Sequence, residues 1–230
     1  MTGTIGAVFA AAVFFVASHF VLSSRLLRAP LAAHIGETGF RILHSAVSLV
    51  VLVWLVRSYA EAPYLELWPA GAWARAVPLA VMPFAAILLA CGLTTRSPTA
   101  IGGEPPPAGE PAPGILKLTR HPVLWAIGLW ALAHMPPNGD AASILFFGAF
   151  AVLAFAGMPM LDRKLSEKLG AAWGPIALTT SVLPFAAMLS GRARLGFDEI
   201  GSWRILAGVA LYLALLVAHG PVIGLSALPG

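Results

Sequence analysis

Six histidines in an apolar chain are the residues best suited to chemistry. Four of them, His19, His44, His134 and His219, lie within long apolar runs, and His121 stands at the start of the run that contains His134. An ionisable side chain inside a membrane-spanning run predicts a functional role, because its burial in lipid is costly. Neutral imidazole is a good ligand for iron, copper and zinc. The alternative for each histidine taken singly is a hydrogen bond to a carbonyl of a neighbouring helix.

Other metal ligands are scarce in the same runs. The one cysteine, Cys91, excludes a disulfide within this chain, a thiolate zinc site and covalent haem attachment through a CxxCH motif. Almost no carboxylate lies within the apolar runs. Among cofactors, a haem ligated by histidine therefore fits this set of residues best.

The most specific local pattern runs from Lys117 to Ser143. Near its start, Arg120 and His121 precede Pro122. Proline is tolerated in the first turn of a helix, because its missing N–H would have no partner there. Arg120 has two interpretations: a charge that sets topology at the inner surface, or a cation that pairs with an anionic group such as a haem propionate.

The same pattern ends in a predicted turn. His134 follows thirteen residues after the first histidine of the pattern, and Pro136 and Pro137 come next and are expected to end the helix. Gly139 allows a tight turn, and Asp140 is placed to cap a helix that begins at the next residue.

The composition excludes several broad classes of protein. Hydrophobic residues make up 59% of the 230 residues and charged residues 10%, whereas a soluble domain carries roughly 25% charged residues. Too few polar side chains remain to cover a globular surface, which excludes a soluble enzyme, a disordered chain and a nucleic-acid-binding module. The sequence therefore predicts an all-α, polytopic membrane helix bundle whose first partner is the lipid bilayer.

Charge-free runs locate the expected spans, because a charge at the bilayer centre costs roughly 2.5–3.5 kcal/mol. The runs without Asp, Glu, Lys or Arg are Met1–Ser24, Ile42–Val56, Ala76–Thr95, His121–Gly139, Ala141–Leu161, Leu169–Gly191 and Ile205–Gly230. A spanning helix needs about 20 residues, and we expect six transmembrane helices. The Leu169–Gly191 run contains Pro175 and Pro184, which predicts a re-entrant or interfacial segment.

Charges in the loops give an orientation. With six spans and one segment that returns to its own side, 12 of the 14 Lys and Arg lie inside, and Arg57 and Arg75 lie outside. We therefore expect a bacterial inner-membrane protein with both termini in the periplasm. The proline-rich stretch 102–114 predicts a flexible cytoplasmic linker between two helical halves of a single membrane domain, 1–230.

The Lys117–Ser143 pattern resembles the NnrU family of bacterial membrane proteins, which includes the zeta-carotene isomerases of plants and cyanobacteria. Supporting residues run along the chain: His19 with Ser23 and Arg25, Gly36-Glu37 with Phe40-Arg41, Ser45, Ser48, Leu161-Asp162-Arg163, Thr180 to Phe185 and Leu225 to Pro229. Two features depart from the pattern. His44 stands where a tyrosine is expected, and the proline-rich stretch looks like an insertion.

This resemblance implies a membrane protein that binds haem b. The isomerase branch is described as using ferrous haem to convert a central cis double bond of a carotenoid to trans, without net oxidation. Matching motifs carry its axial histidines onto His19 and His134, and the candidate haem-binding residues also include His121, Arg120 and His219. The other branch is associated with nitrite and nitric oxide metabolism, which implies a respiratory or denitrification complex as the partner in place of a hydrophobic substrate.

The expected depths of the histidines favour different pairs. At about 1.5 Å per residue, His19 lies about 9 Å from the inner surface and His134 about 9 Å from the outer one. In a core of about 30 Å, roughly 12 Å then separates the two, too far for ligands of one iron. By depth alone, His134 matches His219, and His19 matches His44 and His121. Helix tilt would close most of the gap, so the family pair is kept as the expectation.

A methyltransferase is the alternative enzyme. Arg120-His121-Pro122 at a helix start also resembles the isoprenylcysteine and phospholipid methyltransferases, which hold S-adenosylmethionine in a terminal helical hairpin. Asp162-Arg163 and the stretch from Gly170 to Trp173 replace the acidic pair and the tyrosines expected there.

A non-catalytic transporter or assembly factor is the third hypothesis, although no charged residue in the interior of the spans marks an ion path.

Overall fold

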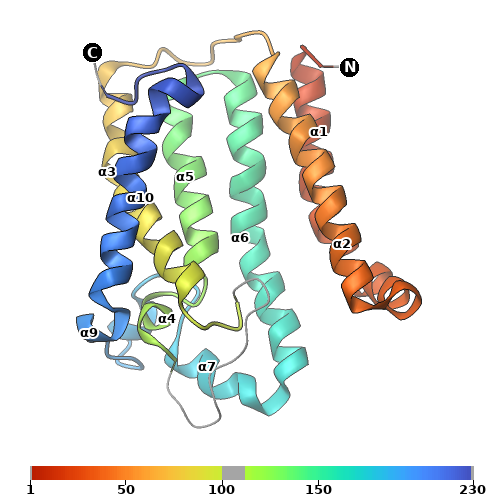
Figure 1. Cartoon of the computed structure of the whole chain (residues 1–230), viewed down its shortest axis with the longest axis vertical. Helices are drawn as coiled ribbons and strands as arrows, with labels where there is room; N and C mark the ends of the chain where they lie inside the picture. The colour runs from red at the N-terminus through yellow and green to blue at the C-terminus, as the bar shows by residue number, and fades with distance from the viewer. Residues whose placement is uncertain (1, 100–111, 229–230) are drawn as a thin grey trace. The chain divides into compact units, whose positions relative to one another are not determined.

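The computed structural model describes residues 2–99 and 112–228, and its regular structure is helical (Figure 1). The helices are α1 (Ile5–Leu22), α2 (Arg25–Ala60), α3 (Ala72–Thr94), α4 (Gly114–Leu118), α5 (Pro122–Asn138), α6 (Ala141–Leu169), α7 (Trp173–Thr179), α8 (Ala186–Leu189), α9 (Phe197–Ile200) and α10 (Ser202–Ile223). Among the described residues there is no strand, only one isolated bridge between Glu66 and Asp140. The expected all-α class is confirmed.

Five segments are long and apolar enough to cross a membrane: Ile5–Leu22, Arg25–Ala60, Trp73–Thr94, Ala141–Thr179 and Ser202–Ile223. They make the chain a multi-pass membrane protein. α5 contains no charged residue but is shorter, with 17 residues. The Leu169–Gly191 run is broken: α7 has seven residues and α8 has four.

The chain divides into two compact units, which are described separately. The first consists of the residues up to Gly71 together with His134–Leu153, and the second of Ala72–Ala133 together with Ala154–Gly230. α5 and α6 contribute residues to both. Residues 102–111 of the predicted linker lie outside the described part of the chain, and α4 begins shortly after them, at Gly114.

In the first unit, α1 packs against α2, and α2 bends sharply near its start (Figure 1). The bend is at Gly36, whose φ of 77° and ψ of 162° are accessible essentially to glycine alone. Arg28 before the bend pairs with Glu37 after it at 2.6 Å. The bend separates a short N-terminal segment from the long apolar part of α2, and the sequence patterns did not predict it.

The turn between α5 and α6 follows the expectation at Asp140. The N–H of Ser143 donates to Asp140 Oδ1 at 3.0 Å and its hydroxyl to Oδ2 at 2.5 Å, so Asp140 caps α6. Gly139 has a φ of 66°, as the tight turn requires. The proline pair lies in the last turn of α5, which ends at Asn138 as expected, and the Asn138 side chain donates to the carbonyl of His134 at 2.6 Å.

In the second unit, α3 packs closely against α10. A Cβ added at Gly208 would lie 2.5 Å from the Cα of Ile87, so only glycine allows this approach. At one end of the unit, α4, α7 and α9 gather near the start of α5 (Figure 1). There the N–H of Arg120 donates to the carbonyl of Ser181 at 2.8 Å, which fixes the chain just before His121.

Candidate functional site

A pair of histidines lies where α1 and α2 meet in the first unit. The ring centres of His19 on α1 and His44 on α2 are 5.7 Å apart, and the ring planes are nearly perpendicular, at 87°. Both residues are half-buried. Phe15 and Phe40, each one turn earlier on the same helix, contact the two imidazoles. The pair is therefore two imidazoles in aromatic surroundings.

One hydrogen bond determines what His19 can do. Its Nδ1 lies 2.7 Å from the carbonyl oxygen of Phe15. A carbonyl only accepts, so Nδ1 carries the proton, and Nε2 of the neutral ring keeps its lone pair. Histidines that bind metals are commonly held in this way, with the other ring nitrogen donating to a carbonyl. His19 is therefore oriented to act as a ligand through Nε2.

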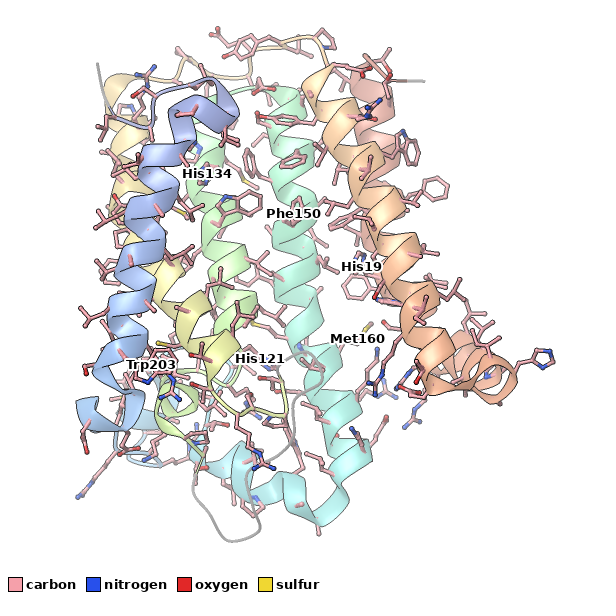
Figure 2. The ribbon with its side chains drawn as sticks, viewed as in Figure 1. His19, His121, His134, Phe150, Met160 and Trp203 are labelled. Carbon is pink, nitrogen blue, oxygen red and sulfur yellow. The ribbon has the colours of Figure 1, made fainter. Side chains whose placement is uncertain are left out.

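Phenylalanine rings lead from His19 to His134 within the first unit. The successive ring-centre distances are 4.7 Å for His19–Phe15, 4.9 Å for Phe15–Phe150, 5.3 Å for Phe150–Phe146, 5.1 Å for Phe146–Phe147 and 5.4 Å for Phe147–His134. Figure 2 shows His134 and His19 at different levels along the helices, with Phe150 at a level between them. The structure brings His19 to His44 and places His134 at the far end of this aromatic row.

A polar cluster lies at the start of α5, in the second unit (Figure 2). His121 is 1% exposed, and its Nε2 lies 2.8 Å from Oδ1 of Asp162 on α6. A guanidinium nitrogen of Arg120 lies 3.4 Å from Oδ2 of the same carboxylate. The ring of Trp173 covers this guanidinium, with 5.4 Å between the guanidinium carbon and the ring centre. Asp162 thus joins two of the predicted site residues.

Burial controls the electrostatics of this cluster. Burial lowers the pKa of the Arg120 guanidinium, Asp162 opposes that shift, and Arg192 adds to it. Arginine stays protonated in proteins, so Arg120 and Asp162 form an ion pair. In the part of the chain that the structure describes, His121 Nδ1 and Arg120 Nε are buried and have no hydrogen-bond partner. Two such atoms on neighbouring residues mark a polar site that a water or a bound group would complete.

The other predicted site residue, His219, makes a structural contact in the second unit. Its Nδ1 lies 2.7 Å from the carbonyl oxygen of Leu225, so the ring ties the end of α10 to the segment after it. Across the described residues, no group of three or more His, Cys, Asp or Glu could hold a metal ion. A haem needs less, because the porphyrin supplies four ligands and the protein one or two.

Sequence reasoning missed Asp162 as the partner of His121 and Arg120. The residue was noted only as part of a family pattern. A signal was available, because the loop charges place the end of the Ala141–Leu161 run and the start of the His121–Gly139 run at the same membrane surface. A carboxylate there is the expected counter-charge for a buried arginine.

The fold and these clusters define a multi-pass helical membrane protein with histidines in aromatic and in charged surroundings. The chain belongs to the NnrU family, whose sequence profile, described as "NnrU protein", matches residues 7–227. The family expected from the sequence is confirmed.

Two plant proteins show related sequence over part of the chain. It is 31% identical over 106 residues to the 15-cis-zeta-carotene isomerase, chloroplastic, of Zea mays, and 36% identical over 110 residues to the protein of the same name from Arabidopsis thaliana. Each match covers 46% of this chain, but 29% of the maize protein and 30% of the Arabidopsis protein. No solved structure matches the chain.

Proposed function

We propose that the protein is a haem-b-dependent cis–trans isomerase that acts on a carotenoid-like polyene in the membrane. Similarity to the two 15-cis-zeta-carotene isomerases supports this reaction class. The observation that carries the proposal is the state of His19, whose Nε2 keeps its lone pair beside a row of aromatic rings. An apolar substrate and an imidazole-ligated cofactor could meet in such surroundings.

The residues of the first unit fit a haem. An imidazole whose Nδ1 donates to a carbonyl is a suitable axial ligand, and His19 meets that requirement. The family pattern adds His134 as a second ligand, and Arg120, His121 and His219 stay predictions as further haem-binding residues. When bound, the haem would supply a ferrous iron that lowers the barrier to rotation about one double bond.

Phenylalanine side chains would hold the polyene. A hydrocarbon chain offers no hydrogen-bonding group, so dispersion and shape must bind and orient it. Phe15, Phe146, Phe147 and Phe150 form a continuous row, with neighbouring ring centres 4.9 to 5.3 Å apart. A row of this kind suits a long, flat and apolar substrate.

The proposed topology has six crossings in a bacterial inner membrane, with both termini in the periplasm. At about 1.5 Å per residue, a helix of the length of α5 reaches about 26 Å, near the lower limit for a span. The broken Leu169–Gly191 segment would lie at the cytoplasmic surface. Arg192 supports this position, because its guanidinium donates to the carbonyl of Leu178 at 2.8 Å and so holds a charge at the end of the segment.

The direct test supplies reduced, haem-loaded protein in lipid nanodiscs with 15-cis-zeta-carotene and follows the isomers by chromatography. We expect conversion of the central cis bond to trans by the wild type and loss of conversion in His19→Ala. Absence of conversion by haem-loaded wild type would overturn the proposal. If the protein instead bound S-adenosylmethionine and no haem, the methyltransferase alternative would replace it.

A further inference from the structure

We propose that His44 supplies the second imidazole of the iron centre, together with His19 and in place of His134. This inference rests on the haem of the proposed function, but it concerns ligation and not the reaction. It follows from three features of the first unit: the distance between the two rings, the packing that fixes them, and the aromatic row that leads to His134.

The spacing of the two rings suits a shared metal. Imidazole nitrogens bind metals at about 2 Å, so two rings on opposite sides of one iron have centres roughly 6 Å apart. The ring centres of His19 and His44 are 5.7 Å apart before any group is bound. The angle of 87° between the rings is no obstacle, because each imidazole can rotate about its own bond to the metal. The spacing of the two rings is therefore compatible with a shared metal.

Packing holds His44 in place. Its ring stacks on Phe40, with centres 6.0 Å apart and an angle of 30° between the planes. Phe40 is itself buried and lies under the Arg28 guanidinium at 5.6 Å. Because Arg28 pairs with Glu37 across the bend of α2, the bend, the phenylalanine and the histidine form one supported group. A ligand supported in this way loses little side-chain freedom on binding.

His134 would need a larger rearrangement to reach the same iron. The aromatic row Phe15, Phe150, Phe146 and Phe147 leads from His19 to His134, and the ring of His134 stacks on Phe147 with 5.4 Å between centres. The depths expected from the sequence also separate His134 from the pair, because His19 and His44 are expected at one level of the bilayer and His134 at another.

The test compares His44→Phe with His134→Phe, both made in the full chain and loaded with hemin. Phenylalanine keeps a flat apolar ring in an apolar helix, and helix content by circular dichroism checks the fold of each variant. We expect the oxidised wild type to give the low-spin absorption and electron paramagnetic resonance spectra of an iron with two imidazoles. His44→Phe should become high-spin, and His134→Phe should keep the wild-type spectra.

Rescue by a small molecule separates ligation from packing. Imidazole added to His44→Ala should restore the low-spin spectra, because it can occupy the place of the missing side chain. A low-spin spectrum in His44→Phe, a high-spin spectrum in His134→Phe, or failure of the wild type to take up hemin would overturn the inference. Carotene isomerisation is measured apart from these spectra, so loss of the proposed reaction and loss of this ligand assignment can be told apart.

Discussion

Asp162 contacts two side chains of the second unit at once, His121 and Arg120. It accepts from His121 at 2.8 Å and faces Arg120 at 3.4 Å, and the side chains of both neighbours are largely buried. Removing one partner of a buried ion pair leaves the other charge without compensation. The contribution of this cluster to the stability of the fold therefore depends on the Asp162 side chain, which the sequence analysis named only as part of a family pattern.

Replacing Asp162 by Asn tests how much the carboxylate contributes to the free energy of unfolding. Asparagine keeps an acceptor for His121 but removes the charge opposite Arg120, so we expect a loss of about 2 kcal/mol in the free energy of unfolding. Thermal unfolding in detergent would measure it. The control, Asp198→Asn, changes an exposed carboxylate of the same unit and should stay within about 0.5 kcal/mol of wild type. Equal effects of the two substitutions would argue against a special role for Asp162.

The pair between Lys117 and Glu199 gives a pH-dependent prediction. The hydrogen bond from Lys117 is the main cause that lowers the pKa of Glu199. A carboxyl whose pKa is lowered by folding stabilises the fold above its unfolded pKa of about 4.3, and this stabilisation disappears as the pH falls through the folded value.

The difference in stability between wild type and Glu199→Gln should therefore depend on pH. The Glu199 side chain is 34% exposed, and solvent screening limits the expected difference at pH 7 to at most about 1 kcal/mol. The difference should be smaller at pH 3 than at pH 7, in thermal unfolding measured at both values. A stability difference that is the same at both pH values would contradict a stabilising ion pair between Lys117 and Glu199.

At the scale of elements, a close helix contact is the approach of α10 to α3 at Gly208. A methyl group there would meet the Ile87 backbone at 2.5 Å, whereas nothing lies within 4 Å of a methyl group at Gly220 on the same helix. We expect Gly208→Ala to destabilise the protein by about 1–3 kcal/mol through overpacking. Gly220→Ala should change stability by less than about 0.5 kcal/mol, because the added methyl group meets nothing within 4 Å. If both variants melt alike, α3 and α10 do not pack in this way.

Local signals predicted the elements where a single residue decides the geometry. Pro122 begins α5 and Asp140 caps α6, as expected from the roles of proline in the first turn and of carboxylates at helix N-termini. The bend of α2 was missed because Gly36, which lies between two charge-free runs, resembles an ordinary helical glycine in the sequence. The Arg28–Glu37 pair spans the bend, and spacing along the sequence does not reveal this contact.

At the scale of the whole molecule, composition alone predicted the all-α membrane class. The charge-free runs predicted six spans, whereas five segments of the described chain are long and apolar enough to cross a membrane, and α5 is shorter. The candidate site was less predictable. Residue type identified the histidines. Depth arithmetic matched His19 with His44 and His121, and the structure brings His19 to His44. The Phe15-to-Phe147 row and the Asp162 contacts depend on how helices turn about their axes, and near-continuous apolar runs carry no periodicity that fixes this rotation.

Topology can be tested by labelling cysteines from outside the cell. In a Cys91→Ser background, Glu61→Cys should react with a membrane-impermeant maleimide, because residue 61 follows α2 on the proposed outer side. Arg194→Cys should react only after the membrane is permeabilised, because the Leu169–Gly191 segment is proposed to return to the inner side. Labelling of both positions in intact cells would mean that this segment crosses the bilayer.

The absorption spectrum of the detergent-purified protein, made with ample haem supply and recorded before and after dithionite, tests the central claim most directly. We predict a Soret band in the wild type, sharpened visible bands on reduction, and loss of the bound haem in His19→Ala. A featureless spectrum from folded wild-type protein would contradict the account.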